Sequence, residues 1–230
     1  MVETGVMTDA QTPADRRLAA ESLAANDPTG WFEPLYAEAA AGTSVVPWDR
    51  AEPNPLLADW LRDRALGSGV RGLVIGCGYG TDAEFVAAQG IRTTAFDISP
   101  TAIRGARARF PHSPVTYKVA DLLRPPATWL GAFDLVVESI TVQSLPPEVR
   151  ATAIANIREF LAPGATLLVI ADISTVPAPG PPWPLTAADI DSFADADVTP
   201  VRVERLPRAD VPGLHRWRAE FHRAADNAPI

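Results

Sequence analysis

The 230-residue sequence has very little cysteine, few histidines and no long apolar run. Its single cysteine, Cys77, excludes an internal disulfide and any metal site built from several cysteines, which suits a reducing compartment. The histidines, His112, His215 and His222, lack the spacing of metal ligands, so we expect no bound metal. No apolar run approaches the roughly 20 residues of a membrane span, and the first residues do not read as a secretion signal. We therefore expect a cytoplasmic protein with no membrane partner.

The sequence also lacks an excess of basic residues. It holds 20 lysines and arginines against 28 acids, which gives a net charge of -8. An acidic surface opposes non-specific binding to a phosphate backbone, so we expect no nucleic-acid partner. With 47% hydrophobic residues, the chain is long enough to form one domain with a single large core. The sequence does not indicate an oligomeric state.

The stretch VRGLVIGCGYGTD, residues 70–82, organises the chain. A short apolar run leads into Gly76, Gly78 and Gly80 and then into residues that can begin a helix, which is typical of a buried strand followed by a tight turn. Glycine permits a positive φ and the close approach of another molecule, at an entropic cost. We interpret the glycines as a turn against which a ligand lies. Cys77 is expected to pack inside this turn and not to act as a nucleophile.

The pattern of apolar runs and breakers predicts alternating strands and helices from residue 70 onward. Strands are expected over residues 73–75, 92–96, 115–119, 133–137 and 165–170, and helices over 81–89, 100–110, 147–161 and 186–194. Strands separated by helices of about ten residues form βαβ units in a parallel sheet covered on both faces. Residues 201–204 and 214–222 alternate apolar and polar side chains, which predicts an antiparallel pair at one edge of the sheet. Further helices are expected over residues 13–25, 31–41 and 55–65.

Two acids at the ends of predicted strands indicate the kind of ligand. The glycine spacing, G-x-G-x-G, is by itself a weak signal, since a dinucleotide site requires G-x-G-x-x-G. Asp97 ends the second strand, where a carboxylate can accept hydrogen bonds from both hydroxyls of a ribose. Asp121 follows the third strand and could accept from an adenine amino group, with Ile98 and Leu122 on either side of the ring. Each acid alone is more often a helix cap or a solvated loop residue, but their order along the strands is hard to obtain by chance.

With these motifs the chain resembles the class I S-adenosylmethionine-dependent methyltransferases, through VIGCGYG, AFDIS and VADLL. The resemblance covers about residues 55–222. It implies a Rossmann-like α/β fold: a mostly parallel sheet of seven strands in the order 3-2-1-4-5-7-6, helices on both faces and an antiparallel C-terminal hairpin. It also implies S-adenosylmethionine as cofactor, with the glycines at its methionyl part. The implied cofactor-binding residues are Gly76, Cys77, Gly78, Gly80, Asp97, Ile98, Asp121 and Leu122, with Glu138 and Ser139 beside the transferred methyl group.

A narrower resemblance involves WFEPLY, PWDRAEPNPLL and PGPPWPLTAADIDSF, which are similar to segments of the thiopurine methyltransferases and of the halide and thiol methyltransferases. It implies a lid in which Trp48, with Trp31, lies over the cofactor and the substrate, and a loop in which Trp183 borders the substrate. Tyr36 stands where a second tryptophan is often found, and the segment 42–48 is longer than usual. Trp31 and Trp48 could equally pack the N-terminal helices onto the sheet.

The resemblance divides one methyltransferase domain into three parts. Residues 1–54 would form an N-terminal helical lid, residues 55–222 the catalytic core, and residues 223–230 a tail.

The chemistry that this cofactor supports favours a soft nucleophile. Methyl transfer from a sulfonium is an in-line displacement, so a dry, closed site helps. A thiol of pKa about 8.5 loses its proton at neutral pH at a cost of about 2 kcal/mol, and a phenol costs roughly twice as much. Glu138 and Asp172 are the candidate catalytic residues, Asp49 and His215 are further candidates for a base, and none stands out. We expect a methyltransferase that acts on a small molecule with a thiol or other soft nucleophile.

Three alternatives remain open at this point. The first is an O- or N-methyltransferase of a natural product, which would need a base for its acceptor. The second, more remote, is a nicotinamide-dependent oxidoreductase, which also uses a glycine turn and a ribose-binding acid. The third is a binding protein that has kept the fold and lost catalysis.

Overall fold

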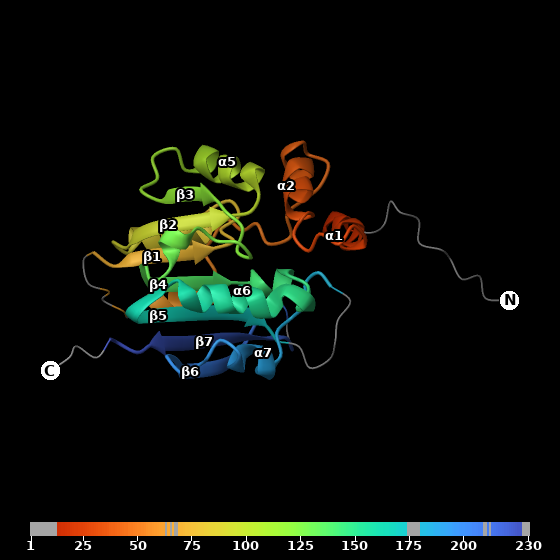
Figure 1. Ribbon diagram of the computed structural model, residues 1–230. Coiled ribbons are helices and arrows are strands. Elements are labelled where there is room, and N and C mark those ends of the chain that lie inside the picture. The colour runs from red at the N-terminus through yellow and green to blue at the C-terminus, as the bar shows by residue number, and fades with distance from the viewer. Residues whose placement is uncertain are drawn as a thin grey trace.

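Seven strands form one sheet in the order β3-β2-β1-β4-β5-β7-β6 (Figure 1). The computed structural model describes residues 13–62, 64, 66, 69–173, 180–208, 211 and 213–226. The strands are β1 (Arg71–Ile75), β2 (Arg92–Asp97), β3 (Thr116–Val119), β4 (Phe133–Ser139), β5 (Leu161–Asp172), β6 (Val198–Pro207) and β7 (His215–Arg223). Strands β1 to β5 pair in parallel, and β7 pairs antiparallel with both β5 and β6. The predicted Rossmann-like order and the antiparallel hairpin are confirmed.

Helices cover both faces of this sheet, and two more lie beyond its carboxyl edge. They are α1 (Ala14–Ala24), α2 (Phe32–Ala40), α3 (Pro55–Arg62), α4 (Thr81–Ala88), α5 (Pro100–Arg109), α6 (Pro147–Glu159) and α7 (Ala187–Asp191), with 3-10 turns η2 (Ala127–Trp129) and η3 (Val142–Ser144). Successive strand residues point to opposite faces, so Val74 packs with α3, α4 and α5, whereas Leu73 and Ile75 pack with α6 and α7. Two apolar cores result, one on each face.

The N-terminal helices α1 and α2 lie beyond the carboxyl ends of the parallel strands (Figure 1). Glu33 of α2 connects these helices to the start of α5 by hydrogen bonds. Its carboxylate accepts hydrogen bonds from the Ser99 hydroxyl and from the backbone and side chain of Thr101, at the start of α5. Burial acts to raise the pKa of Glu33, but these hydrogen bonds outweigh it and lower that pKa. An ionised Glu33 therefore holds α2 next to the end of β2.

The predicted boundary between α6 and β5 is wrong, α7 ends at Asp191 before the predicted residue 194, and β6 extends beyond the predicted 201–204 at both ends. The expected helix over 147–161 ends at Glu159, and β5 already begins at Leu161 and runs through Pro163 and Gly164, which were expected to lie between helix and strand. The register of β5 against β4 is irregular here, with Leu161 paired to Phe133 and regular pairing resuming further along. A proline and a glycine are tolerated in a strand at such an irregularity, because the ladder is interrupted there anyway.

Strand β7 is buried on its polar face as well as its apolar face. Glu220 accepts hydrogen bonds from the Trp60 indole of α3 and from the guanidinium of Arg64. Arg218 pairs with Asp59 of α3 and with Glu204 of β6. Helix α3 therefore covers the polar face of the hairpin through ion pairs. Within the described residues, no helix has the length and apolar character needed to cross a bilayer.

Candidate functional site

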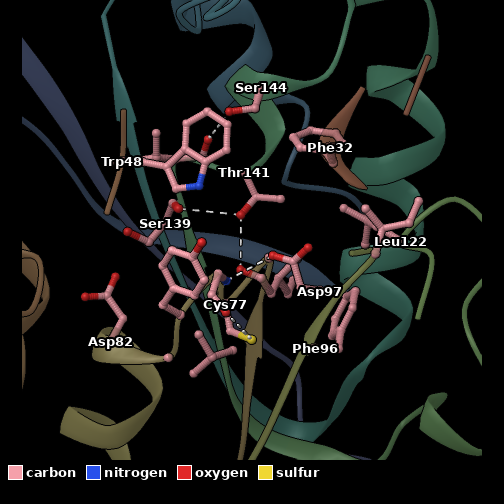
Figure 2. A pocket seen from close by; sticks show the side chains of 18 of the residues that line it. Phe32, Trp48, Cys77, Asp82, Phe96, Asp97, Leu122, Ser139, Thr141 and Ser144 are labelled. Atoms are coloured by element: carbon pink, nitrogen blue, oxygen red, sulfur yellow. Dashed lines mark hydrogen bonds between the residues drawn. The ribbon is translucent and has the colours of Figure 1, made fainter. Parts of the chain in front are cut away.

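A cavity lies at the carboxyl ends of β1, β2 and β4, beneath the N-terminal helices. Its lining includes Phe32, Tyr36, Trp48, Asp49, Arg50, Ser144, Leu145 and the segments 74–82, 96–98, 120–123 and 139–141. Figure 2 shows Trp48 and Phe32 on one side, Cys77 and Phe96 on the other, and Asp97 between them. The predicted residues that line this cavity are Gly76, Cys77, Gly78, Gly80, Asp97, Ile98, Asp121, Leu122, Ser139 and Trp48. Trp31, Glu138, Asp172 and Trp183 are not among its described lining residues.

The glycine turn forms the floor of the cavity. Gly76, Gly78 and Gly80 have φ values of 57°, 52° and 93°, which favour glycine. A Cβ at Gly76 would collide with the Thr141 side chain, and one at Gly80 with the Tyr117 hydroxyl. A ligand lying against the turn is therefore not the only reason for glycine at these positions. The protein's own side chains already occupy the space that a Cβ would need, and the tight packing sets the shape of the turn.

Asp97 is the most constrained acid of the cavity. Its side chain is 5% exposed, with Oδ2 accepting from the Gly78 N–H and Oδ1 from the Ser99 N–H, both at 2.9 Å. Burial raises the pKa of Asp97 to about 6, against the lowering effect of these N–H groups. A carboxylate has about four lone-pair positions, so these N–H groups do not use all the acceptor capacity of Asp97, which lines the cavity.

Asp121 and its neighbours form the end of the cavity beyond β3. Asp121 Oδ1 accepts from the Leu123 N–H at 2.8 Å, which fixes the turn after the strand. Leu122 is buried, Ile98 is half-buried, and both line the cavity with apolar surface. This end therefore offers one acid and two aliphatic side chains, which suits a flat, partly polar ring.

The end of β4 and the loop after it bring three hydroxyl groups, those of Ser139, Thr141 and Ser144, to the lining of the cavity. Ile140 has φ of 68°, a strained value for a β-branched residue, and such strain is often found at functional sites. The Thr141 hydroxyl donates to the Ile75 carbonyl and the Ser144 hydroxyl to the Ile140 carbonyl, both at 3.0 Å. The Ser139 hydroxyl accepts from the Asn54 side-chain amide. These hydroxyls hold the loop in place.

Glu138 lies behind this loop instead of facing the cavity. It is fully buried, and its Oε1 accepts from the backbone N–H groups of Thr141 at 2.7 Å and Val142 at 2.8 Å. Its Oε2 is buried without a hydrogen-bond partner. Burial raises the pKa of Glu138 to about 7, although the two N–H groups act in the opposite direction. The structure thus does not bring Glu138 to the position expected beside the methyl group.

Asp172 is also turned away from the cavity. Its carboxylate pairs with Arg216 at 2.7 Å and Arg208 at 3.2 Å, and it accepts from the Gln143 amide at 3.0 Å. Trp183 is anchored through its backbone, which donates to the Gln143 carbonyl and accepts from Arg150. These two residues belong to a polar network between β5, β7 and the segment that precedes α7.

The two lid tryptophans have different places. Trp48 lines the cavity, and its indole N–H donates to the Tyr36 hydroxyl at 2.8 Å. Trp31 is 1% exposed and stacks on Phe32 with ring centroids 4.1 Å apart, so it packs the N-terminal helices. The interpretation as a cavity lid residue therefore suits Trp48, and the packing interpretation suits Trp31.

Polar contacts hold the segment around Trp48 against the glycine turn. Asp49 forms two hydrogen bonds of 2.8 Å with Arg109 of α5, whose guanidinium also lies over the Tyr79 ring. Thr81 Oγ1 donates to the Arg50 carbonyl, and the Asn54 N–H donates to Asp82. Sequence reasoning did not single out Arg50 or Phe32 as cavity residues. Their only sequence signal was nearness to Trp48 and Trp31.

The cavity fits the cofactor that the sequence implies. Asp97 keeps open acceptor positions for hydroxyls, Asp121 and Leu122 offer a ring site, and the glycine turn lies between them and Trp48. Burial raises the pKa of the Cys77 thiol well above its ordinary value, in line with the expectation that it is not a nucleophile. Among the described residues, no group of His, Cys, Asp and Glu is arranged to hold a metal ion.

Known proteins resemble the chain in sequence and in fold. The profile of the family described as thiopurine S-methyltransferase matches residues 39–221. The chain is 26% identical over 234 residues to the probable thiol methyltransferase 2 of Arabidopsis thaliana, covering 96% of this chain and 99% of that protein. It is 28% identical over 186 residues to thiocyanate methyltransferase 1 of the same plant, covering 76% and 80%. The solved structure of the 1,6-didemethyltoxoflavin-N1-methyltransferase of Burkholderia thailandensis has a TM-score of 0.63 at 20% identity, covering 95% and 93%.

The region that the family profile matches includes most of the segments that line the cavity. The family profile extends from the lid segment to the last strand of the sheet, so it includes the glycine turn, both strand-end acids and the loop after β4. The solved structure shares the fold alone. The chain therefore belongs to the thiopurine S-methyltransferase family and is an S-adenosylmethionine-dependent methyltransferase.

Proposed function

We propose that this protein transfers a methyl group to the sulfur of a small thiol. The relatives named for thiol and thiocyanate methylation support a sulfur acceptor. The cavity supports it independently, because an acceptor that ionises without help needs no base from the protein.

For the cofactor, we propose that Asp97 accepts hydrogen bonds from the ribose hydroxyls and that Asp121 and Leu122 hold the adenine. Gly76 and Gly78 would lie along the methionyl part, since they join these acids to the wall formed by Trp48 and Ser139. When bound, the cofactor supplies an electrophilic methyl group on a sulfonium. The acceptor sulfur forms the new carbon–sulfur bond as the bond to the sulfonium breaks, and the thiol proton goes to solvent.

The protein's part in this reaction is to position the acceptor and exclude water. Phe32, Trp48, Ile140 and Leu145 contribute apolar side chains to the lining of the cavity. Opposite charges cancel when a thiolate meets a sulfonium, so an apolar surround favours the transition state. Holding the reacting atoms in line could contribute up to about 7–11 kcal/mol of the barrier reduction.

The observation that carries the proposal is the lack of an available base. Of the described lining residues, none is a histidine, a lysine or a glutamate. The lining carboxylates are Asp49, which Arg109 holds, Asp97 and Asp121 on the cofactor side, and Asp82 near Arg50. His215 is exposed on β7 and is not among the described lining residues either. A thiol tolerates this arrangement far better than a phenol or an amine does.

The test uses acceptors of similar shape that differ in nucleophile and in thiol pKa. With S-adenosylmethionine, we expect methylation on sulfur and a kcat/KM that rises with pH, with an inflection that follows the pKa of each thiol. A matching phenol should react at least about tenfold more slowly at neutral pH, because its ionisation costs roughly 2 kcal/mol more. An inflection at one pH for all acceptors would indicate a base on the protein. Faster turnover of phenols or amines would favour the O- or N-methyltransferase alternative.

We further propose that residues 13–54 act as a lid over the catalytic core and that the protein works in the cytoplasm. The contacts of Asn54 with Ser139 and of Asp49 with Arg109 join this segment to the core and support the first point. The single cysteine supports the second, since it suits a reducing compartment. Residues 1–12 and 227–230 of the predicted lid and tail lie outside the described residues.

A further inference from the structure

One ion pair in the cavity takes no part in the site described so far. Arg50 and Asp82 both line the cavity, and Arg50 Nη2 lies 3.9 Å from Asp82 Oδ2, which is too long for a hydrogen bond. Among the described lining residues, only Arg50 has a cationic side chain. The side chains are 33% and 15% exposed, so each is partly enclosed but reachable from the cavity.

The backbone around this pair is held, while its charged atoms stay available. The Arg50 carbonyl accepts from Thr81 Oγ1 at 2.9 Å, and Asp82 Oδ1 accepts from the Asn54 N–H at 2.7 Å. Within the described chain, the Arg50 guanidinium donates no hydrogen bond, and Asp82 Oδ2 accepts none. A cation and an anion are thus fixed side by side without satisfying each other.

Their place in the cavity indicates what they bind. In Figure 2, Asp82 lies at one end of the view and Leu122 at the other, with Asp97 between them. If Asp97 takes the ribose and Leu122 the adenine, the end with Asp82 receives the part of the cofactor farthest from the adenine. That part is an α-amino acid, which carries one carboxylate and one ammonium group.

We propose that Arg50 and Asp82 form the subsite for the amino-acid end of the cofactor. Arg50 donates to the carboxylate, for which a planar guanidinium is well shaped, and Asp82 Oδ2 accepts from the ammonium. The other lining acid near the lid, Asp49, is held by Arg109, so it does not compete for the ammonium. This subsite rests on the cofactor orientation given under the proposed function, but it does not depend on the identity of the acceptor.

The test compares two ligands by titration calorimetry. S-adenosylhomocysteine has the amino-acid end, whereas 5′-methylthioadenosine shares the adenosine and sulfur but lacks it. Arg50→Gln should lower the affinity for S-adenosylhomocysteine at least about tenfold, because charge-assisted hydrogen bonds are lost. The affinity for 5′-methylthioadenosine should stay within about twofold of that of the unmodified protein. Asp82→Asn keeps an acceptor for the Asn54 N–H and should show the same selectivity. Arg62→Gln removes an exposed arginine of α3 and serves as the matched control, with no change for either ligand.

The outcomes separate this subsite from the wider proposal. Equal weakening of both ligands, or no weakening of either, would overturn the subsite and leave the proposed function standing. An unchanged affinity for S-adenosylhomocysteine together with a raised KM for thiols would assign Arg50 to the acceptor and also overturn it. Failure of the unmodified protein to bind either ligand would overturn both proposals.

Discussion

The carboxyl edge of the sheet has two halves, one formed by β2 and β3 and the other by β4 and β5. Each half carries two acids near its strand ends, and the acids of the two halves differ in their hydrogen-bond partners. On the side of β2 and β3, Asp97 ends β2 and accepts two backbone hydrogen bonds, Asp121 follows β3 and accepts one, and both line the cavity. Near the ends of β4 and β5, Glu138 accepts from the N–H groups of Thr141 and Val142 at the start of η3, and Asp172 pairs with two arginines, so neither is among the described lining residues. The comparison teaches that an acid at a strand end can bind a ligand only where its neighbours leave an acceptor open.

The largest expected effect is on ligand binding by the first half. Asp97→Ala should lower the affinity for S-adenosylhomocysteine about 100-fold, because two hydrogen bonds from the ribose hydroxyls to a charged group are lost. Titration calorimetry measures this, with Asp191→Ala, an exposed acid of α7, as the control. An affinity for Asp97→Ala within threefold of the unmodified protein would remove the distinction between the two halves.

A large effect on stability, and none on binding, is expected in the second half. Asp172→Ala leaves Arg216, which is 8% exposed, with its charge uncompensated, so the free energy of unfolding should fall by about 2–3 kcal/mol. Denaturant titration measures the loss, and Asp59→Ala, which removes an exposed partner of Arg218, should lower the stability much less because solvent screens that pair. If Asp172→Ala instead weakened cofactor binding by tenfold or more, Asp172 would belong to the site.

Glu138, in the second half, should make the stability of the protein depend on pH. Its pKa is raised from 4.5 to about 7, so the folded protein retains a proton that the unfolded chain releases between these values. Stability from this group is therefore present below about pH 4.5 and is lost as the pH rises through about 7. Glu138→Gln should stabilise the protein by about 1–3 kcal/mol at pH 8 and by little at pH 4.5. Thermal unfolding at both pH values checks this, and an equal change at the two would contradict it.

The smallest expected effect is at the lid contact with α5. Arg109→Gln breaks the pair with Asp49, whose side chains are 36% and 32% exposed, and should lower the free energy of unfolding by under about 1 kcal/mol. Since Asp49 adjoins Trp48, the dissociation rate of S-adenosylhomocysteine should rise modestly, and added salt should reduce the difference from the unmodified protein. Stopped-flow measurements of tryptophan fluorescence at two salt concentrations test this. No difference in dissociation rate at low salt would show that the pair does not hold the lid.

The side of the cavity that holds the glycine turn, Asp97 and Asp121 was largely predictable, because its sequence signals are local. The turn around Gly76 and Gly78, the acid that ends β2 and the acid after β3 are each placed by a strand read from its own apolar run, and parallel strands bring these ends together. The side of the cavity next to the end of β4 was less predictable. Whether Glu138 faces the cavity depends on the strained backbone of Ile140 and on the N–H groups beyond it, which no periodicity reveals.

The error at the start of β5 has a related cause. Pro163 and Gly164 are local signals that end a helix, and the helix does end, but the pairing of Leu161 with Phe133 places the strand boundary before them. Pairing with a neighbouring strand is a tertiary interaction, and it outweighed local propensity there. Similarly, the glycine turn was identified from its residues, while the side chains that fill it come from α2, β3 and the loop after β4.

The sequence by itself determined the order of strands and helices, the glycine turn and the two acids that follow β2 and β3, because each of these depends on a few adjacent residues. Only the tertiary structure decided which acids face the cavity, which tryptophan lines it, and that Arg50 lies beside Asp82. Those outcomes depend on which distant N–H groups and guanidinium groups reach each carboxylate, and competition of that kind is settled only when the chain is folded.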